Sequence, residues 1–185
     1  IYATRLTCGL IKNKLTEYDL LSSTDLREIL PGQEIRMGCM KVRAIRVNHS
    51  IPDAVAYAIE TPAGIVIQTG DFKVDFTPVS DETIDLASFT EYGKRGVLAL
   101  LADSTNAERP GFSRSERSVG QSFMNLFAQA EGKRIIIATF ASNLQRIQQI
   151  IDMAIKYDRK VAISGRSMVN NTAMAFELGY LHAPE

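Results

Sequence analysis

The fold is decided by residues 42–71, VRAIRVNHSIPDAVAYAIETPAGIVIQTGD. Three apolar runs, at 42–47, 54–60 and 64–68, are separated here by segments rich in turn-forming residues. Alternation of apolar and polar residues in the first run is typical of a half-buried strand. The connection TPAG at 61–64 has the length of an antiparallel hairpin loop. We therefore predict an antiparallel meander of three strands over this stretch.

A helix and two short extended runs precede this meander. The apolar residues that recur about every four positions, and so predict one buried helical stripe, are Leu6, Leu10, Ile11 and Leu15. Residues 25–30 form a short extended run that ends at the turn signal PG, and a second run follows at 34–40. The first part of the chain is thus predicted to be a strand meander with a helix against it.

The pattern changes after residue 86. Apolar runs at 97–102, 135–140 and 161–163 alternate there with helical patterns, which predicts parallel strands joined by crossover helices. The predicted helix boundaries are a capping box of Ser113 and Glu116 with an end near Ala130, a start at Ser142 or Asn143, and a third helix from about Ser167 to Gly179.

Composition excludes several classes of protein. The 185 residues carry 21 basic and 21 acidic side chains, so the net charge of zero supplies no chain-wide field that attracts a polyanion. No apolar run approaches the roughly 18 residues of a membrane span. The two cysteines, Cys8 and Cys39, are too few for a disulfide scaffold, which favours a reducing compartment, and we expect both to be small core residues.

Polar residues follow the ends of three predicted strands. His49 comes after the run at 42–47, Asp71 after the run at 64–68, and Asp103 after the run at 97–102. The first and third strands of a meander run in the same direction, so His49 and Asp71 leave the same edge of the sheet. Two strand spacings place them about 10 Å apart before their loops curve.

An imidazole and a carboxylate at one edge suit a zinc or manganese site. Each residue also has a structural interpretation: His49 as a hydrogen-bonded loop residue and Asp71 as an Asx-turn residue after glycine. A catalytic zinc site uses about three protein ligands, and the sequence has no HxH, HExxH or CxxC to complete the set. Composition and spacing alone therefore leave the metal site undecided.

Five longer strings add a resemblance. They are NHSIPDA at 48–54, TGDFKVD at 69–75, ADSTNAE at 102–108, FASN at 140–143 and SGRSM at 164–168. In this order they resemble the ribonuclease J family, and the sequence is similar to that family from end to end.

The resemblance implies an α/β fold in two parts. Residues 1–105 would be part of a metallo-β-lactamase αββα sandwich, and residues 106–185 part of a Rossmann-like parallel α/β β-CASP domain. The segment NAERPGFSRS at 106–115, rich in charges and in residues that break regular structure, would hold the boundary. The implied activity is a zinc-dependent ribonuclease with two zinc ions, a 5′ to 3′ exonuclease and endonuclease of RNA processing and decay.

The resemblance also implies roles for residues of the strand-end set. His49 matches a metal-ligand motif, and Asp71 matches a second one whose carboxylate bridges the two ions, which makes Asp71 both a ligand and a catalytic residue. Asp103 matches an acidic motif expected to orient a catalytic histidine. Asp53 and Lys73 are expected only beside the ligands.

A phosphate-binding surface is expected in the second part of the chain. The residues concerned lie between predicted strands and helix starts, where free backbone amides favour an anion; they are Ser142, Asn143, Ser164, Gly165, Arg166 and Ser167. The alternative is that these serines and this asparagine only cap helices.

The sequence departs from the family pattern in its histidines. The HxHxDH motif expected to supply most metal ligands would precede Ile1, so we expect the sequence to be an inactive internal segment of a longer cytoplasmic protein. Gln145 stands where many relatives are expected to have histidine. Expected partners are RNA and a further copy or a paralogue, with no membrane. A nucleotide- or RNA-binding α/β module without chemistry remains the alternative.

Overall fold

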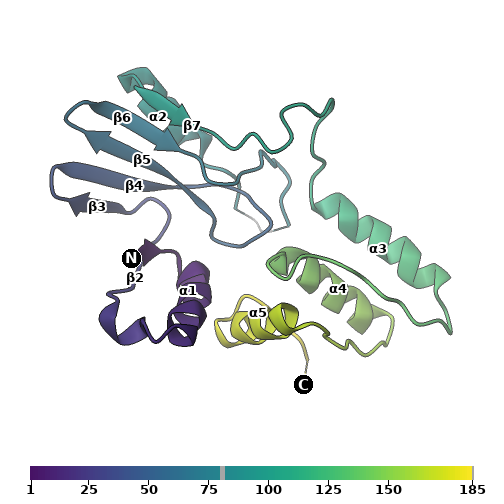
Figure 1. Cartoon of the computed structure of the whole chain (residues 1–185). Helices are drawn as coiled ribbons and strands as arrows, with labels where there is room; N and C mark the ends of the chain where they lie inside the picture. Colours follow the sequence, from purple (N-terminus) through teal and green to yellow (C-terminus); the bar gives the residue numbers. More distant parts are fainter. Residues whose placement is uncertain (80–81, 185) are drawn as a thin grey trace. The chain divides into compact units, whose positions relative to one another are not determined.

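The structure is a computed structural model that describes residues 1–79 and 82–184. These residues form two compact units, which are 1–49 with 53–76 and 82–113, and 50–52 with 77–79 and 114–184. Helices and strands occur together along the chain, which confirms the predicted α/β class (Figure 1). Among the described residues, no helix combines the length and the hydropathy needed to traverse a bilayer.

The first unit is built on a sheet whose strands follow the chain order. The strands are β3 (Glu34–Met37), β4 (Met40–Arg46), β5 (Val55–Thr61), β6 (Gly64–Gln68) and β7 (Ala99–Leu101). Neighbours are antiparallel from β3 to β6, whereas β7 is parallel to β6. The predicted meander of three strands is confirmed as β4, β5 and β6.

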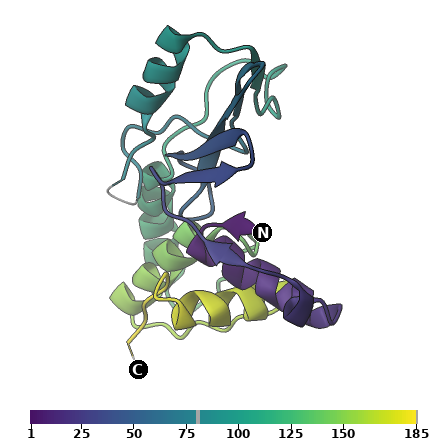
Figure 2. The same cartoon turned by 90° about the vertical axis from the view of Figure 1, so that its left-hand side faces the viewer.

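One face of this sheet is covered by α2 (Leu86–Arg95), as Figure 2 shows. Tyr92 of α2 is 1% exposed and packs with Ala56 and Ala58 of β5, which are fully buried. Helix α2 was not predicted from the sequence. Its signals are a capping aspartate, Asp85, whose carboxylate accepts from the Ser88 amide at 3.0 Å, and a glycine immediately after the last helical residue.

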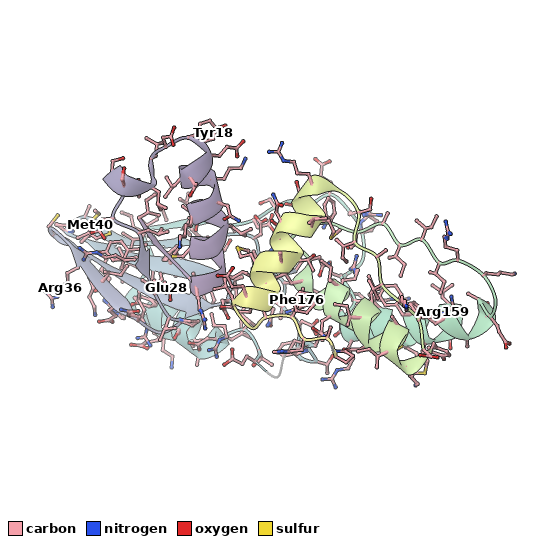
Figure 3. The ribbon with its side chains drawn as sticks, turned by 90° about the horizontal axis from the view of Figure 1, so that it is seen from below. Tyr18, Glu28, Arg36, Met40, Arg159 and Phe176 are labelled. Atoms are coloured by element: carbon pink, nitrogen blue, oxygen red, sulfur yellow. The ribbon has the colours of Figure 1, made fainter. Side chains whose placement is uncertain are left out.

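The rest of the first unit is α1 with a small parallel pair of strands. The elements are β1 (Tyr2–Ala3), α1 (Arg5–Glu17), the 3₁₀ turn η1 (Leu21–Ser23) and β2 (Arg27–Glu28), and β1 pairs with β2. Tyr18, labelled in Figure 3, follows the last residue of α1. Of the predicted apolar stripe, Leu6 is fully buried and the other members are half-buried.

The two cysteines differ in their surroundings. Cys8 on α1 is buried, as predicted, and burial raises the pKa of its thiol. Cys39 is exposed because it lies in the turn between β3 and β4, so its prediction as a core residue was wrong. Arg36 and Met40, labelled in Figure 3, mark this hairpin, which lies at the end of the sheet where β4 begins.

The second unit contains α3 (Arg117–Gln129), α4 (Leu144–Lys156) and α5 (Arg166–Glu177). Phe123 and Phe127 of α3 pack against Ala154 of α4, and the Phe127 ring lies 5.9 Å from the Tyr157 ring between centroids. Arg159, labelled in Figure 3, follows α4 and donates hydrogen bonds to the backbone carbonyls of residues 130 and 133. Packing of the α3 and α4 apolar faces thus holds the second unit together.

Two expectations for the second unit were wrong. Residues 135–140 and 161–163 are not strands within the described part of the chain. Residues 135–137, 139 and 161–163 instead line a cavity of about 620 Å³ beside α4. A strand requires a neighbour that pairs with its backbone, and sequence periodicity cannot supply that neighbour. The capping box also fails, because α3 begins at Arg117 and the Glu116 carboxylate pairs with Arg146 at 2.8 Å.

The turn between β5 and β6 generates a stability prediction. Gly64 has φ +146°, and an added Cβ would approach the Leu98 Cβ to 2.9 Å. Gly64→Ala should therefore lower the free energy of unfolding by about 2–4 kcal/mol through strain and overlap. Gly38→Ala is the control, because Gly38 has φ +62° with no neighbour within 4 Å, and it should cost only about 1–2 kcal/mol. Denaturant unfolding measures both; equal losses would contradict the steric account.

Candidate metal centre

Three loops leave the same edge of the first unit's sheet. β4 and β6 are each antiparallel to β5, and β7 is parallel to β6, so the carboxyl ends of β4, β6 and β7 lie at one edge. His49 follows β4, Asp71 follows β6, and Asp103 follows β7. The strand directions alone thus bring these residues to a common rim.

His49 and Asp71 face each other at this rim. The His49 Nε2 atom lies 3.9 Å from the Asp71 Oδ2 atom, and the two side chains are 33% and 75% exposed. Their loops curve toward each other beyond the strands, which brings the pair closer than the strand spacing alone. The structure therefore places an imidazole and a carboxylate together where solvent and a ligand have access.

Asn48 ties the His49 loop to two other segments. Its amide nitrogen donates to the Glu82 carbonyl at 2.8 Å, and its amide oxygen accepts from the Ile84 backbone at 2.9 Å. Its own carbonyl accepts from the Lys73 amide at 2.7 Å, two residues beyond Asp71. The buried Asn48 thus uses its side chain and its backbone to fix the chain on either side of the pair.

Hydrogen bonds from its neighbours lower the pKa of the Asp103 carboxyl. Its Oδ1 atom accepts from the Thr105 hydroxyl at 2.5 Å and from the Thr105 amide at 2.9 Å. These bonds, first the hydroxyl's and then the amide's, keep the pKa of the Asp103 carboxyl below its ordinary value, and the Phe72 amide and His49 act in the same direction. Asp103 therefore presents a carboxylate near His49.

The two residues expected beside the ligands have defined positions. Lys73 Nζ lies 3.7 Å from Oδ2 of Asp75, whose side chain is 5% exposed. Asp53 has a left-handed backbone with φ +59° in the turn before β5, a conformation that aspartate tolerates. Lys73 thus forms an ion pair with the buried Asp75 carboxylate. Asp53 provides a left-handed turn in the loop that follows His49.

The distance between His49 and Asp71 would allow both side chains to bind the same metal ion. Two atoms that are each about 2.1 Å from one ion are at most about 4.2 Å apart, and the 3.9 Å between His49 and Asp71 meets that condition. Within residues 1–79 and 82–184, no group of at least three His, Cys, Asp or Glu side chains is arranged to hold an ion. The described residues therefore offer two donors of a larger set.

The predicted phosphate-binding residues lie at two helix N-termini of the second unit. The Asn143 carboxamide accepts from the Arg146 amide at 3.1 Å, which makes it the cap of α4, and Ser142 beside it is exposed. At α5 the N-cap residue is Gly165, which has no side chain that could bond the first amides. Ser164, Gly165, Arg166 and Ser167 are all exposed.

The two N-termini are connected through α5. The side-chain Nδ2 of Asn171 donates to the Ala141 carbonyl at 3.2 Å, which joins the middle of α5 to the loop before α4. At α4, the hydrogen bond from the Arg146 amide to the Asn143 side chain supports the interpretation of Asn143 as a helix cap. At α5 the glycine cap supplies no such bond, and anion binding there stays a prediction.

Sequence reasoning missed the importance of Asn48 and Thr69. Asn48 stands within the NHSIPDA string, and Thr69 begins the TGDFKVD string, but neither was singled out. Both are buried polar residues at strand ends, with exposures of 8% and 5%. The signal that could have found them is a small polar residue between an apolar run and a chemically active side chain.

Known proteins with similar sequences indicate the family of this chain. The family model "Ribonuclease J, beta-CASP domain" matches residues 132–185. The protein named Ribonuclease J of Synechocystis sp. is 46% identical over 100% of this chain and 29% of its own length. The chain belongs to the ribonuclease J family. The resemblance of the five strings is thereby confirmed.

Other ribonuclease J relatives are similar to the same extent. The Thermus thermophilus protein is 44% identical over 98% of this chain and 32% of its own length. One from Helicobacter pylori is 43% identical over 100% of the chain and 27% of its length. The chain therefore spans about a third or less of these relatives, and the expectation that it corresponds to part of a longer family member is confirmed.

A solved structure shares the fold at low sequence identity. It is titled "Crystal Structure of a Protein of Unknown Function from Enterococcus faecalis V583", with a TM-score of 0.70 and 17% identity. The alignment covers 98% of this chain and 44% of that chain. The assignment of residues 1–105 and 106–185 to a metallo-β-lactamase and a β-CASP domain stays a prediction; the family model covers only the later part of the second range.

The cap of α4 generates a second stability prediction. Asn143→Ala removes the acceptor for the Arg146 amide at a position 4% exposed, and it should cost about 1–2 kcal/mol of unfolding free energy. Asn143→Asp keeps an acceptor in the same place and should unfold near the wild-type midpoint. Denaturant unfolding compares the three proteins. An unchanged midpoint for Asn143→Ala would show that the cap does not stabilise the unit.

Proposed function

We propose that the full-length protein containing this chain is a metal-dependent ribonuclease that hydrolyses RNA phosphodiester bonds. The observation that carries the proposal is the 3.9 Å approach of the His49 Nε2 and Asp71 Oδ2 atoms at the rim where β4 and β6 end. Its support from relatives is that proteins named Ribonuclease J are 43–46% identical to this chain. The proposed activity is therefore that of a hydrolase, and specifically of a nuclease.

The proposed cofactor is a pair of zinc ions, for which His49 and Asp71 are two of the ligands. Zinc accepts imidazole nitrogen and carboxylate oxygen, which matches this donor pair. When bound, two such ions activate water and neutralise the charge that develops on the phosphate. The remaining ligands would come from other parts of the full-length protein.

Each rim residue has a distinct task in this proposal. His49 presents Nε2 as a neutral donor, so its imidazole must be unprotonated at that atom. Asp71 is 75% exposed and has two oxygens, so its carboxylate can reach two ions. The Asp103 carboxylate, whose Oδ1 atom is bonded by Thr105, would accept a hydrogen bond from a histidine and fix its ring orientation.

The second unit is proposed to hold the RNA backbone. The first amides of α5, to which the glycine cap offers no side-chain acceptor, and the exposed Arg166 favour a phosphate group. Ser164, Gly165 and Ser167 would add donors at the same place. Ser142 and Asn143 would contribute less, since the Asn143 side chain is engaged as the α4 cap.

We further propose that the parent enzyme acts both from 5′ ends and at internal sites, in RNA processing and decay in the cytoplasm. Association with a further copy or a paralogue belongs to the same proposal. A non-catalytic RNA- or nucleotide-binding module is the competing function, favoured only by the absence of a third ligand near the pair within the described residues. Activity measurements separate the two.

The decisive substitutions remove one donor at a time from the full-length protein. His49→Ala and Asp71→Asn should each lower cleavage of single-stranded RNA by at least about 100-fold, because each removes a ligand of the proposed ions. Bound zinc, measured by mass spectrometry of the metal, should fall in both variants. The substrate should be tested with a 5′ monophosphate and as a circle, which separates end-dependent from internal cleavage.

His182→Ala is the matched control, since His182 is the other histidine, and its backbone forms two hydrogen bonds with the Gln148 side chain. It should cleave RNA at the wild-type rate and keep its zinc. Near wild-type cleavage by His49→Ala or Asp71→Asn would refute the ligand assignment. Tight RNA binding by a wild-type protein that never cleaves would support the non-catalytic module.

A further inference from the structure

Thr69 lies at the point where β6 and β7 separate. It directly follows β6, and its side chain is 5% exposed. Its backbone amide donates to the Leu101 carbonyl at 3.0 Å, which extends the parallel pairing of the two strands by one residue. Beyond Thr69 one chain leads to Asp71 and the other to Asp103.

The Thr69 hydroxyl contacts both diverging chains. It accepts a hydrogen bond from the Asp103 amide at 3.0 Å and donates to the Gly70 carbonyl at 2.8 Å. A hydroxyl has one proton and two lone pairs, so both bonds can exist at once. The Leu101 carbonyl, 3.4 Å away, is a weaker alternative acceptor.

The hydroxyl replaces a backbone group of the ladder. In a regular parallel pair, the residue that donates to the Leu101 carbonyl would also accept, through its own carbonyl, from the Asp103 amide. Here the hydroxyl accepts instead, so the Thr69 carbonyl is released from the ladder. The backbone then turns at Gly70, which has φ +58°, a left-handed value that favours glycine.

The consequence is that one oxygen atom fixes two peptide groups of the rim. The Gly70 carbonyl belongs to the peptide that ends at the Asp71 nitrogen, so its orientation governs how Asp71 leaves the sheet. The Asp103 amide belongs to the residue whose carboxylate is bonded by Thr105. Burial of Thr69 excludes most of the water that could replace either bond.

We propose that Thr69 is a positioning residue, whose hydroxyl holds the Asp71 and Asp103 loops in the spacing that the active site requires. The activity part of this inference rests on the proposed function. Its structural part concerns the chain alone, because the hydroxyl and both partners belong to the first unit. The inference requires the hydroxyl itself, whereas a packing role would require only the shape of the side chain.

The test compares Thr69→Val, which keeps the shape and removes the hydroxyl, with Thr69→Ser, which keeps the hydroxyl. Both are made in the full-length protein. Thr69→Val should lower kcat on bis-p-nitrophenyl phosphate by about tenfold or more, as loss of groups that orient ligands does. Thr69→Ser should stay within about threefold of the wild type. This small diester has no nucleobase, so RNA affinity does not enter the result.

A second readout does not depend on activity. Hydrogen–deuterium exchange of the metal-free protein reports the Asp103 amide in peptides that cover residues 100–105. Exchange at that amide should be about tenfold faster in Thr69→Val and unchanged in Thr69→Ser. Thr4→Val is the matched control: Thr4 is 3% exposed, and its hydroxyl bonds Thr7 on α1, so kcat and Asp103 exchange should match the wild type.

The outcomes separate this inference from the proposed function. Wild-type kcat and exchange in Thr69→Val would overturn the positioning role while leaving the nuclease intact, and so would a Thr69→Ser variant as impaired as Thr69→Val. A wild-type protein without phosphodiesterase activity would overturn the proposed function, and the exchange result would still decide the structural part. If Thr69→Val yields little folded protein, Thr69→Cys replaces it, with an expected loss of about threefold or more from its weaker hydrogen bonds.

Discussion

The direction of the strands in the first unit is the constraint on which the rim depends. Backbone pairing makes β4, β6 and β7 point the same way, with β5 antiparallel between the first two. Adjacent strands are separated by about 4.8 Å, so three loops are delivered to one edge before any side chain acts. The buried cluster of Tyr92, Ala56 and Ala58 then holds α2 against the sheet.

Much of this arrangement could be predicted from local sequence patterns. The meander follows from alternation and from the TPAG connection, and the start of α4 follows from Asn143, because each signal acts within a few residues. The prediction of strands at 135–140 and 161–163 was wrong because strand pairing depends on two segments, whereas an apolar run in the sequence indicates only one of them. Helix α2 was missed although Asp85 and the glycine after Arg95 carry ordinary cap signals.

The same difference between local and long-range signals applies to the candidate site. His49 and Asp71 could be found because they directly follow apolar runs and stand in strings that resemble a family. The bonds that position them could not, since Asn48 bonds the backbone of Ile84, 36 residues away, and the Thr69 hydroxyl accepts from Asp103, 34 residues away. Asp103 itself lacked any local sign that Thr105 would bond its carboxylate and lower its pKa. Long-range hydrogen bonds at strand ends therefore carry the part of the site that only the fold reveals.

The central claim is that His49 and Asp71 ligate the same metal centre. The most direct measurement is a crystal structure of the full-length protein with anomalous diffraction collected on both sides of the zinc absorption edge. The account predicts an anomalous peak about 2.0–2.2 Å from both His49 Nε2 and an Asp71 oxygen. A fully loaded, active enzyme whose peaks all lie beyond bonding distance of these two side chains would contradict it.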